Sequence, residues 1–194
     1  MKINNIDTDN KVFIIAEIGN NHEGDLKLAK EMISLAAEAG ADAVKFQTFN
    51  TEYYISNSDM QRFELLKSFE LSKDDFKMLR EHAKDKKLSF ISTPFDIESS
   101  IFLNEIVDAI KISSSDNNFF PLLKTVAYGK KPIIVSTGLI NIKEIEKTIN
   151  YIIAKANNII SKDKLALLHC VTSYPVEYQY ANLNAIKTLR GNFD

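Results

Sequence analysis

The chain has 194 residues, 45% of them hydrophobic, and a formal net charge of −2. This suits one globular domain with a substantial core, and the near-neutral charge gives no electrostatic footprint for nucleic acid or an anionic membrane. No apolar stretch approaches the roughly 18 residues that span a bilayer, and the polar N-terminus lacks a secretory signal. The single cysteine, Cys170, excludes an intrachain disulfide, and we expect it to be a buried, unreactive thiol. We therefore expect a cytoplasmic protein with neither nucleic-acid nor membrane partners.

Six short apolar runs have the composition of buried strands, and each ends in polar residues. In chain order they are VFIIAEIGN, DAVKFQTF, LSFISTPF, DAIKISSSD, PIIVSTG and LALLHCVTSYP. Each is rich in Val, Ile, Leu or Phe, as expected of a strand that is buried on both faces. The polar residues at their ends are Glu17, Lys45, Gln47, Ser92, Thr93, Lys111, Ser113, Ser114, Asp116, Ser136, Thr137, His169, Thr172 and Tyr174. When every strand delivers polar residues at the same end, those ends are expected to share one site.

Helical segments separate the apolar runs. The residues expected at or near the starts of these helices are Asp25, Ser72, Asp96, Pro121 and Asn141. A last helix is expected over residues 183–189. Residues 49–70 form a long insertion after the second run, on the same side as the expected site, where insertions often cover a substrate. Strict alternation of strand and helix predicts a parallel sheet with right-handed crossovers.

Such a sheet is either open and doubly wound or closed into a barrel. Dinucleotide-binding folds carry a Gly-rich turn after the first strand, but Gly19 and Gly24 in EIGNNHEGD do not fit G-x-G-x-x-G. Functional groups at the ends of all six strands favour a TIM (β/α)8 barrel. Such a barrel takes about 250 residues, and this chain supplies about six β/α units. We therefore expect residues 1–194 to be the N-terminal portion of a single barrel domain.

Two lysines, Lys45 and Lys111, fall within the strand pattern, where a solvated lysine is unexpected. A buried ammonium is costly unless it is paired. One interpretation is a structural ion pair, for instance between Lys45 and Glu17. The other is a phosphate or carboxylate site, which would suit two lysines flanked by hydroxyl groups. Asp116 and Glu17 could balance the lysines or move protons, whereas His169 by itself does not make a metal site.

The chain resembles the N-acetylneuraminate (sialic acid) synthase family, which includes legionaminate and pseudaminate synthases and spore-coat polysaccharide synthases. The resemblance lies in IIAEIGNNHEGDLKLAKEMISLAAEAGADAVKFQTF, FISTPFD, AIKISSSD, KPIIVSTG and LLHCVTSYP, in that order. It implies a (β/α)8 barrel that condenses phosphoenolpyruvate with an N-acylated aldose, such as N-acetylmannosamine. The implied products are a nonulosonic acid and phosphate, which leaves by C–O cleavage.

The same resemblance implies roles for individual residues. The positions that match phosphoenolpyruvate-binding ones are Lys45, Thr93, Lys111, Ser114, Ser136 and Thr172, the last where some members have Asn. Glu17, Gln47 and Asp116 match acidic and polar positions around the reacting carbons and the sugar, with Glu17 and Asp116 as the catalytic candidates. Asp116 stands where some members have Glu. Tyr174 matches an aromatic position of the sugar pocket.

The resemblance also implies a divalent metal ion, Mn or Mg, that polarises the sugar aldehyde. Its histidine ligands, and a C-terminal antifreeze-like domain that contributes to a homodimer, are expected beyond residue 194, so this segment alone is expected to be inactive. Two alternatives stay open. One is a Schiff-base aldolase with Lys111 or Lys45 as nucleophile, and the other is a truncated, non-catalytic protein that binds a sugar acid.

Overall fold

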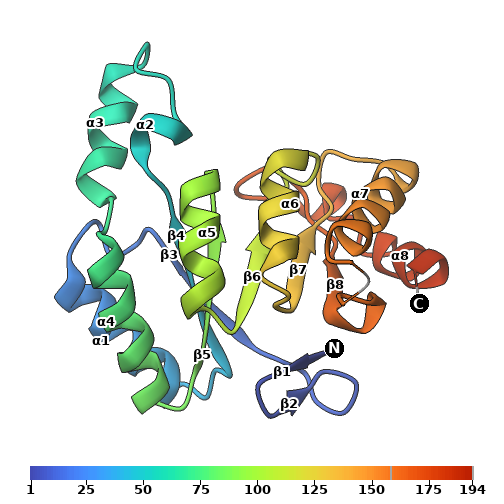
Figure 1. The fold of residues 1–194 in the computed structure, drawn as a ribbon, viewed down its shortest axis with the longest axis horizontal. Coiled ribbons are helices and arrows are strands. Elements are labelled where there is room, and N and C mark those ends of the chain that lie inside the picture. The colour runs from blue at the N-terminus through green and yellow to red at the C-terminus, as the bar shows by residue number, and fades with distance from the viewer. Residues whose placement is uncertain (158, 194) are drawn as a thin grey trace.

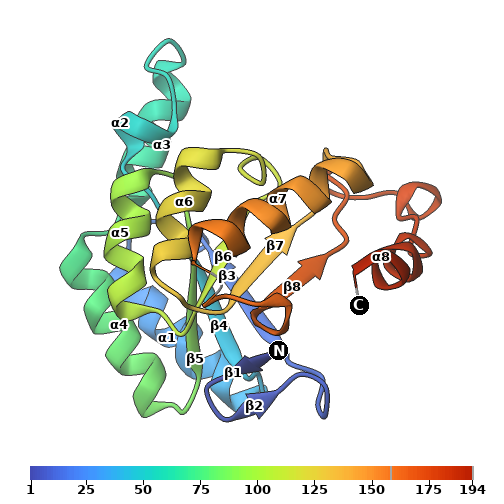
Figure 2. The same cartoon turned by 45° about the vertical axis from the view of Figure 1, so that its right-hand side comes forward.

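The six apolar runs form one parallel sheet in the computed structural model, which describes residues 1–157 and 159–193 (Figure 1). Its strands are hydrogen-bonded in chain order: β3 (Ile15–Gly19), β4 (Ala43–Thr48), β5 (Ser89–Pro94), β6 (Ala109–Ile112), β7 (Ile133–Ser136) and β8 (Leu165–Leu168). The sheet curls into a half-barrel (Figures 1 and 2). All five strand pairs are parallel, so the prediction of an α/β fold with a parallel sheet is confirmed.

Helices follow one another around the outside of the sheet (Figures 1 and 2). They are α1 (Leu26–Glu38), α4 (Lys73–Asp85), α5 (Ile97–Ile106), α6 (Phe120–Tyr128), α7 (Ile142–Lys155) and α8 (Ala185–Phe193). The predicted N-caps are confirmed, since Asp25, Ser72, Asp96 and Asn141 each accept a hydrogen bond from the first turn of their helix. The last helix begins later and ends later than predicted, because its buried Leu189 packs against α7 and the chain up to Asn184 forms a turn. None of the described helices is long and apolar enough to cross a membrane.

An antiparallel hairpin that the polar N-terminus did not predict lies under the sheet. It consists of β1 (Lys2–Ile3) and β2 (Ile6–Asp7). Ile3 is completely buried against the inner face of the sheet, and Asn4 Nδ2 donates to Ser89 Oγ at 3.0 Å. The hairpin therefore seals the end of the half-barrel at which the strands begin.

The two faces of the sheet differ because strand side chains alternate. Outward residues such as Val44, Phe46 and Ile110 pack against the helices in the main core. The inner face has a lower layer of apolar residues next to the hairpin: Ile15, Ala43, Ile91, Ala109, Ile134 and Ala166. Two residues further along the same strands, the upper layer of the inner face consists of Glu17, Lys45, Thr93, Lys111, Ser136 and Leu168.

The insertion at residues 49–70 forms the short helices α2 (Thr51–Tyr54) and α3 (Met60–Phe69). Figures 1 and 2 show it projecting above the sheet, beyond the end of β4. No residue of α3 is buried, so this helix does not pack over the sheet in the way that a closed cover would. Its base is fastened by Glu70, whose carboxylate accepts hydrogen bonds from the Thr51 backbone N–H at 2.9 Å and hydroxyl at 2.6 Å.

Candidate functional site

Two buried lysines dominate the upper layer. Lys45 on β4 and Lys111 on β6 are each only 8% exposed. Their strands flank β5, so both ammonium groups rise from the same inner face above the apolar lower layer. A long aliphatic stem suits this position, because it can cover apolar surface while the charged end remains in a polar environment.

Lys45 has a carboxylate partner. Its Nζ lies 2.9 Å from Glu17 Oε2 and 3.0 Å from Oε1. An irregularity in the β3–β4 register between Glu17 and Gly19 accompanies this arrangement. Burial lowers the pKa of Lys45, and the Glu17 charge opposes that shift. The sequence-based interpretation of a Lys45–Glu17 ion pair is therefore confirmed.

Lys111 forms no such pair with any carboxylate of the described residues. Its Nζ donates to the Ile112 carbonyl oxygen at 2.8 Å and to Ser136 Oγ. Burial lowers the pKa of Lys111 to about 8, and the positive charge of Lys45 adds to this effect. The upper layer thus holds two cations and one directly paired carboxylate, which leaves it with excess positive charge.

Hydroxyl groups surround these cations. Thr93 Oγ1 on β5 is buried and has no hydrogen-bond partner in the part of the chain that the structure describes. Ser136 on β7 accepts from Lys111 and also from Cys170 Sγ, at 3.1 Å. A buried hydroxyl without a partner is uncommon, so Thr93 is available to a bound group.

Cys170 is not the buried, isolated thiol that its apolar surroundings predicted. It is partly exposed and follows the end of β8, where its side chain reaches Ser136 across the inner face. The local sequence could not reveal this contact, because it depends on where β8 ends and on its pairing with β7. Cys170 is therefore part of the surroundings of Lys111.

Ser114 and Thr172 come together at Gly138. The Gly138 backbone N–H donates to Ser114 Oγ at 3.2 Å. A Cβ at Gly138 would lie 2.7 Å from Ser114 Oγ and 3.0 Å from Thr172 Cγ2, so only glycine leaves room for both side chains. These two predicted site residues therefore lie beside the end of β7.

Asp116 and Tyr174 differ in how far they are buried. Asp116 is partly buried, its Oδ2 accepts from Ser115 Oγ at 2.7 Å, and burial raises the pKa of its carboxyl. Tyr174, by contrast, is 93% exposed in the segment after β8. The structure therefore places Asp116 in a partly desolvated environment and leaves Tyr174 on the surface.

Gln47 has a partner that the sequence did not indicate. Asn20, in the loop after β3, donates from Nδ2 to Gln47 Oε1 at 2.8 Å. A second residue that the sequence analysis missed is Asn117, which is buried and donates to the carbonyl oxygens of Ser136 at 3.1 Å and Gly138 at 2.9 Å. Loop asparagines are common in sequences, so no local signal marked either of them.

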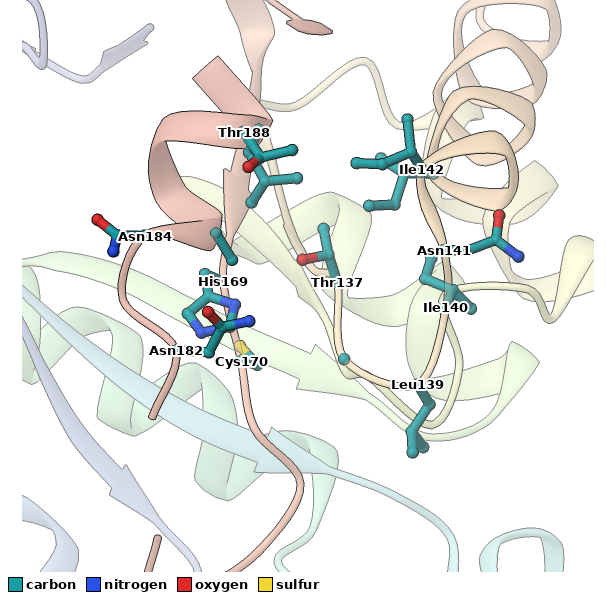
Figure 3. Close-up of a pocket in the computed structure, with 14 residues that line it drawn as sticks. Thr137, Leu139, Ile140, Asn141, Ile142, His169, Cys170, Asn182, Asn184 and Thr188 are labelled. Atoms are coloured by element: carbon teal, nitrogen blue, oxygen red, sulfur yellow. The ribbon is translucent and has the colours of Figure 1, made fainter. Parts of the chain in front are cut away.

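A pocket of about 510 Å³ lies next to the upper layer, between the β7–α7 loop and the start of α8 (Figure 3). Thr137, His169 and Asn182 line it, and His169 Nε2 lies 2.8 Å from the Ala181 carbonyl oxygen. Among the described residues, no group of three or more His, Cys, Asp or Glu side chains could hold a metal ion. His169 therefore belongs to a pocket wall rather than to a cluster of metal ligands.

Comparisons with a family model and with individual relatives all indicate the same protein family. Residues 32–194 match the model of the NeuB family. An N,N'-diacetyllegionaminic acid synthase from Legionella pneumophila is 42% identical over 195 residues, which are 93% of this chain and 54% of the relative. The enzyme with the same description from Campylobacter jejuni is 39% identical over 197 residues, 94% of this chain and 58% of the relative.

The fold agrees with a solved structure. A crystal structure of an N-acetylneuraminic acid (sialic acid) synthetase from Leptospira borgpetersenii, in complex with citrate, is similar with a TM-score of 0.90 and 39% identity. The match covers 98% of this chain and 66% of that one. The chain spans about half the length of the curated relatives that it matches.

Proposed function

Because the chain belongs to the NeuB family, we propose that it carries the phosphoenolpyruvate-binding part of a nonulosonic acid synthase site within a TIM (β/α)8-type barrel. The proposed reaction condenses phosphoenolpyruvate with an N-acylated aldose, such as N-acetylmannosamine, to give a nonulosonic acid and phosphate. Relatives described as legionaminic acid synthases and a sialic acid synthetase support this reaction class.

The observation that carries the proposal is the charge state of the upper layer. Lys111 is buried near Lys45, and of these two lysines only Lys45 has a carboxylate partner among the described residues. An uncompensated buried cation is costly, and an anionic ligand removes that cost. Phosphoenolpyruvate offers a carboxylate and a phosphate, each of which suits charge-assisted hydrogen bonds from a lysine.

The hydroxyl groups supply the remaining contacts of this proposal. Thr93 Oγ1 is buried without a partner and would donate to an oxygen of the ligand. Ser136 already accepts from Lys111, so its own O–H proton can point to the same ligand. Ser114 and Thr172, held together at Gly138, would border the site.

In the proposed reaction, C3 of phosphoenolpyruvate bonds to the aldehyde carbon, and water adds to C2 as the C2–O bond to phosphate breaks. The aldehyde oxygen takes up a proton, and the water gives up protons. Asp116 suits proton transfer, because burial raises the pKa of its carboxyl. Glu17 suits the stabilisation of positive charge and the orientation of the aldose, because Lys45 holds its carboxylate.

The family resemblance also implies a divalent ion, Mn or Mg, and a homodimer, and both stay predictions. A divalent ion would polarise the aldehyde. The described side chains do not form a cluster of three ligands for it. They therefore do not fit a complete metal site.

Titration calorimetry with phosphoenolpyruvate tests the proposal on the 194-residue chain. We expect binding by the wild type and by Lys27→Met, an exposed-lysine control on α1, and loss of binding in Lys111→Met. Absence of binding by the wild type would contradict the proposal. A phosphate-release assay with N-acetylmannosamine and manganese should show no turnover, since the metal ligands are missing from the described residues.

A Schiff-base aldolase is the second candidate, and the pKa of Lys111, lowered to about 8, favours it. Borohydride reduction in the presence of pyruvate separates the two functions. A Schiff-base enzyme would gain a stable adduct on Lys111 detectable by mass spectrometry. The synthase proposed above would gain none.

A further inference from the structure

Asn20, in the loop after β3, touches one polar residue of the candidate site, Gln47. Resting on the proposed function, we infer that Asn20 is a positioning residue that holds the Gln47 amide with its NH2 group facing the aldose. The contact is the 2.8 Å hydrogen bond from Asn20 Nδ2 to Gln47 Oε1. Asn20 would therefore act on the aldose through Gln47.

The loop geometry after β3 accounts for this contact. Gly19 has a φ of +56°, a conformation that glycine adopts without strain, and the β3–β4 register shifts between Glu17 and Gly19. This turn brings Asn20 to the end of β4, where Gln47 follows Lys45 on the inner face. A single irregularity thus accompanies both the Lys45–Glu17 pair and the Asn20–Gln47 pair.

Two observations support the orientation of the Gln47 amide. First, Asn20 Oδ1 is buried without a partner, and exchanging the ends of both amides would bury an unpaired NH2 group there instead. Unpaired buried N–H groups are rarer than unpaired carbonyl oxygens. Second, a Cβ at Gly19 would lie 3.2 Å from Glu17 Oε1 and 3.7 Å from Gln47 Nε2. The amide nitrogen of Gln47 and the Glu17 carboxylate oxygen therefore both border the space beside Gly19, where an amide donor suits the nearby negative charge better than a carbonyl oxygen does.

The result is a donor and an acceptor that both lie beside Gly19. Glu17 can accept a hydrogen bond, and Gln47 Nε2 can donate one. A hydroxyl group both donates and accepts, so it can satisfy both side chains at once. This pairing fits a hydroxyl of a polyhydroxylated aldose, and it discriminates against analogues in which that hydroxyl is missing or methylated.

Asn20→Asp tests the inference, because the ionised carboxylate has the shape of the amide but cannot donate to Gln47 Oε1. Gln47 is then expected to turn its carbonyl oxygen toward the aldose. The probe is N-acetylmannosamine, titrated by saturation-transfer NMR into the chain saturated with phosphoenolpyruvate. We expect at least about tenfold weaker aldose binding at pH 7.5, with phosphoenolpyruvate affinity changed less than about twofold.

Acidic pH and a second substitution separate positioning from a merely structural role. The loss in Asn20→Asp should shrink toward pH 5, because a protonated carboxyl can donate again. In Gln47→Leu, adding Asn20→Asp should cause no further loss. Asn118→Asp, which adds the same charge at an exposed position near Asp116, should bind the aldose like the wild type.

The outcomes distinguish the two proposals. Failure of the wild type to bind phosphoenolpyruvate would overturn the proposed function, and this inference with it. Normal phosphoenolpyruvate binding, with no aldose binding by the wild type or with unchanged aldose binding in Asn20→Asp, would overturn the inference alone. Fully additive losses in the double variant would also overturn it, since Asn20 would then act without Gln47.

Discussion

The lower and upper layers of the inner face come from the same six strands, only two residues apart, yet they serve opposite purposes. Ala43 precedes Lys45 and Ala109 precedes Lys111, while Ile134 precedes Ser136. The lower layer is apolar and sealed by the N-terminal hairpin. The upper layer buries charge and leaves one hydroxyl unpartnered. One layer stabilises the half-barrel, and the other lowers its stability where a ligand is expected to bind.

This difference shows why the lysines can be tolerated. Each lysine stem stands over apolar side chains, so only the ammonium group requires polar partners. Lys45 pairs with Glu17, whereas Lys111 donates to neutral acceptors, the Ile112 carbonyl oxygen and Ser136 Oγ. Changes in the lower layer should therefore affect folding, and changes in the upper layer should affect binding and stability in opposite directions.

Ile91→Ala should give the largest effect, because it removes a fully buried side chain from the lower layer. We expect the free energy of unfolding to fall by about 2–4 kcal/mol. Urea denaturation measures this. Ile97→Ala, at an exposed position of α5, is the matched control and should cost less than about 1 kcal/mol. Equal losses in the two variants would contradict a packed lower layer.

Lys111→Met should weaken phosphoenolpyruvate binding about 100-fold and raise the free energy of unfolding by about 1–3 kcal/mol. Calorimetry and urea denaturation measure the two effects. The pKa of Lys111 is about 8 in the folded protein, below its ordinary value of 10.5, so burial penalises the ammonium form. The stability that Lys111→Met gains over the wild type should therefore be full below pH 8 and should disappear as the pH rises toward 10.5. A variant less stable than the wild type at pH 7 would refute this interpretation.

Phosphoenolpyruvate affinity should fall about tenfold between pH 7 and pH 9, since the Lys111 cation is lost above its pKa of about 8. Calorimetry at a series of pH values measures the change. Lys111→Arg stays charged over this range, so its affinity should vary far less. An equally steep decline in that variant would assign the pH dependence to another group.

Thr93→Val should weaken phosphoenolpyruvate binding by about three- to tenfold while leaving the stability equal or slightly higher, because its hydroxyl has no partner. Thr148→Val is the matched control. Thr93 is 2% exposed and Thr148 is 1% exposed, but Thr148 Oγ1 donates to the Asn117 carbonyl oxygen at 2.8 Å. Its replacement should reduce stability by about 1 kcal/mol. If the two variants lose the same stability, Thr93 has a partner after all.

The local sequence predicted those features that depend on neighbouring residues. The alternation in DAVKFQTF identifies Lys45 and Gln47 as residues of one face, and N-caps such as Asn141 follow from helix chemistry. The local sequence did not predict contacts between residues that are far apart along the chain. A single apolar residue, Ile3, gave no periodic signal for the hairpin, and Cys170 looked buried because its neighbours are apolar.

Local patterns in the chain are enough to predict which strand residues face inward and where most helices begin, because both depend on only a few neighbouring residues. The Lys45–Glu17 pair was one of two interpretations open to the sequence. Tertiary structure establishes that this pair forms, that Lys111 has no carboxylate partner among the described residues, and that Asn20 reaches Gln47. It also decided that Tyr174 lies on the surface. These outcomes depend on strand order and register, which bring distant segments within hydrogen-bonding distance and which no local pattern specifies.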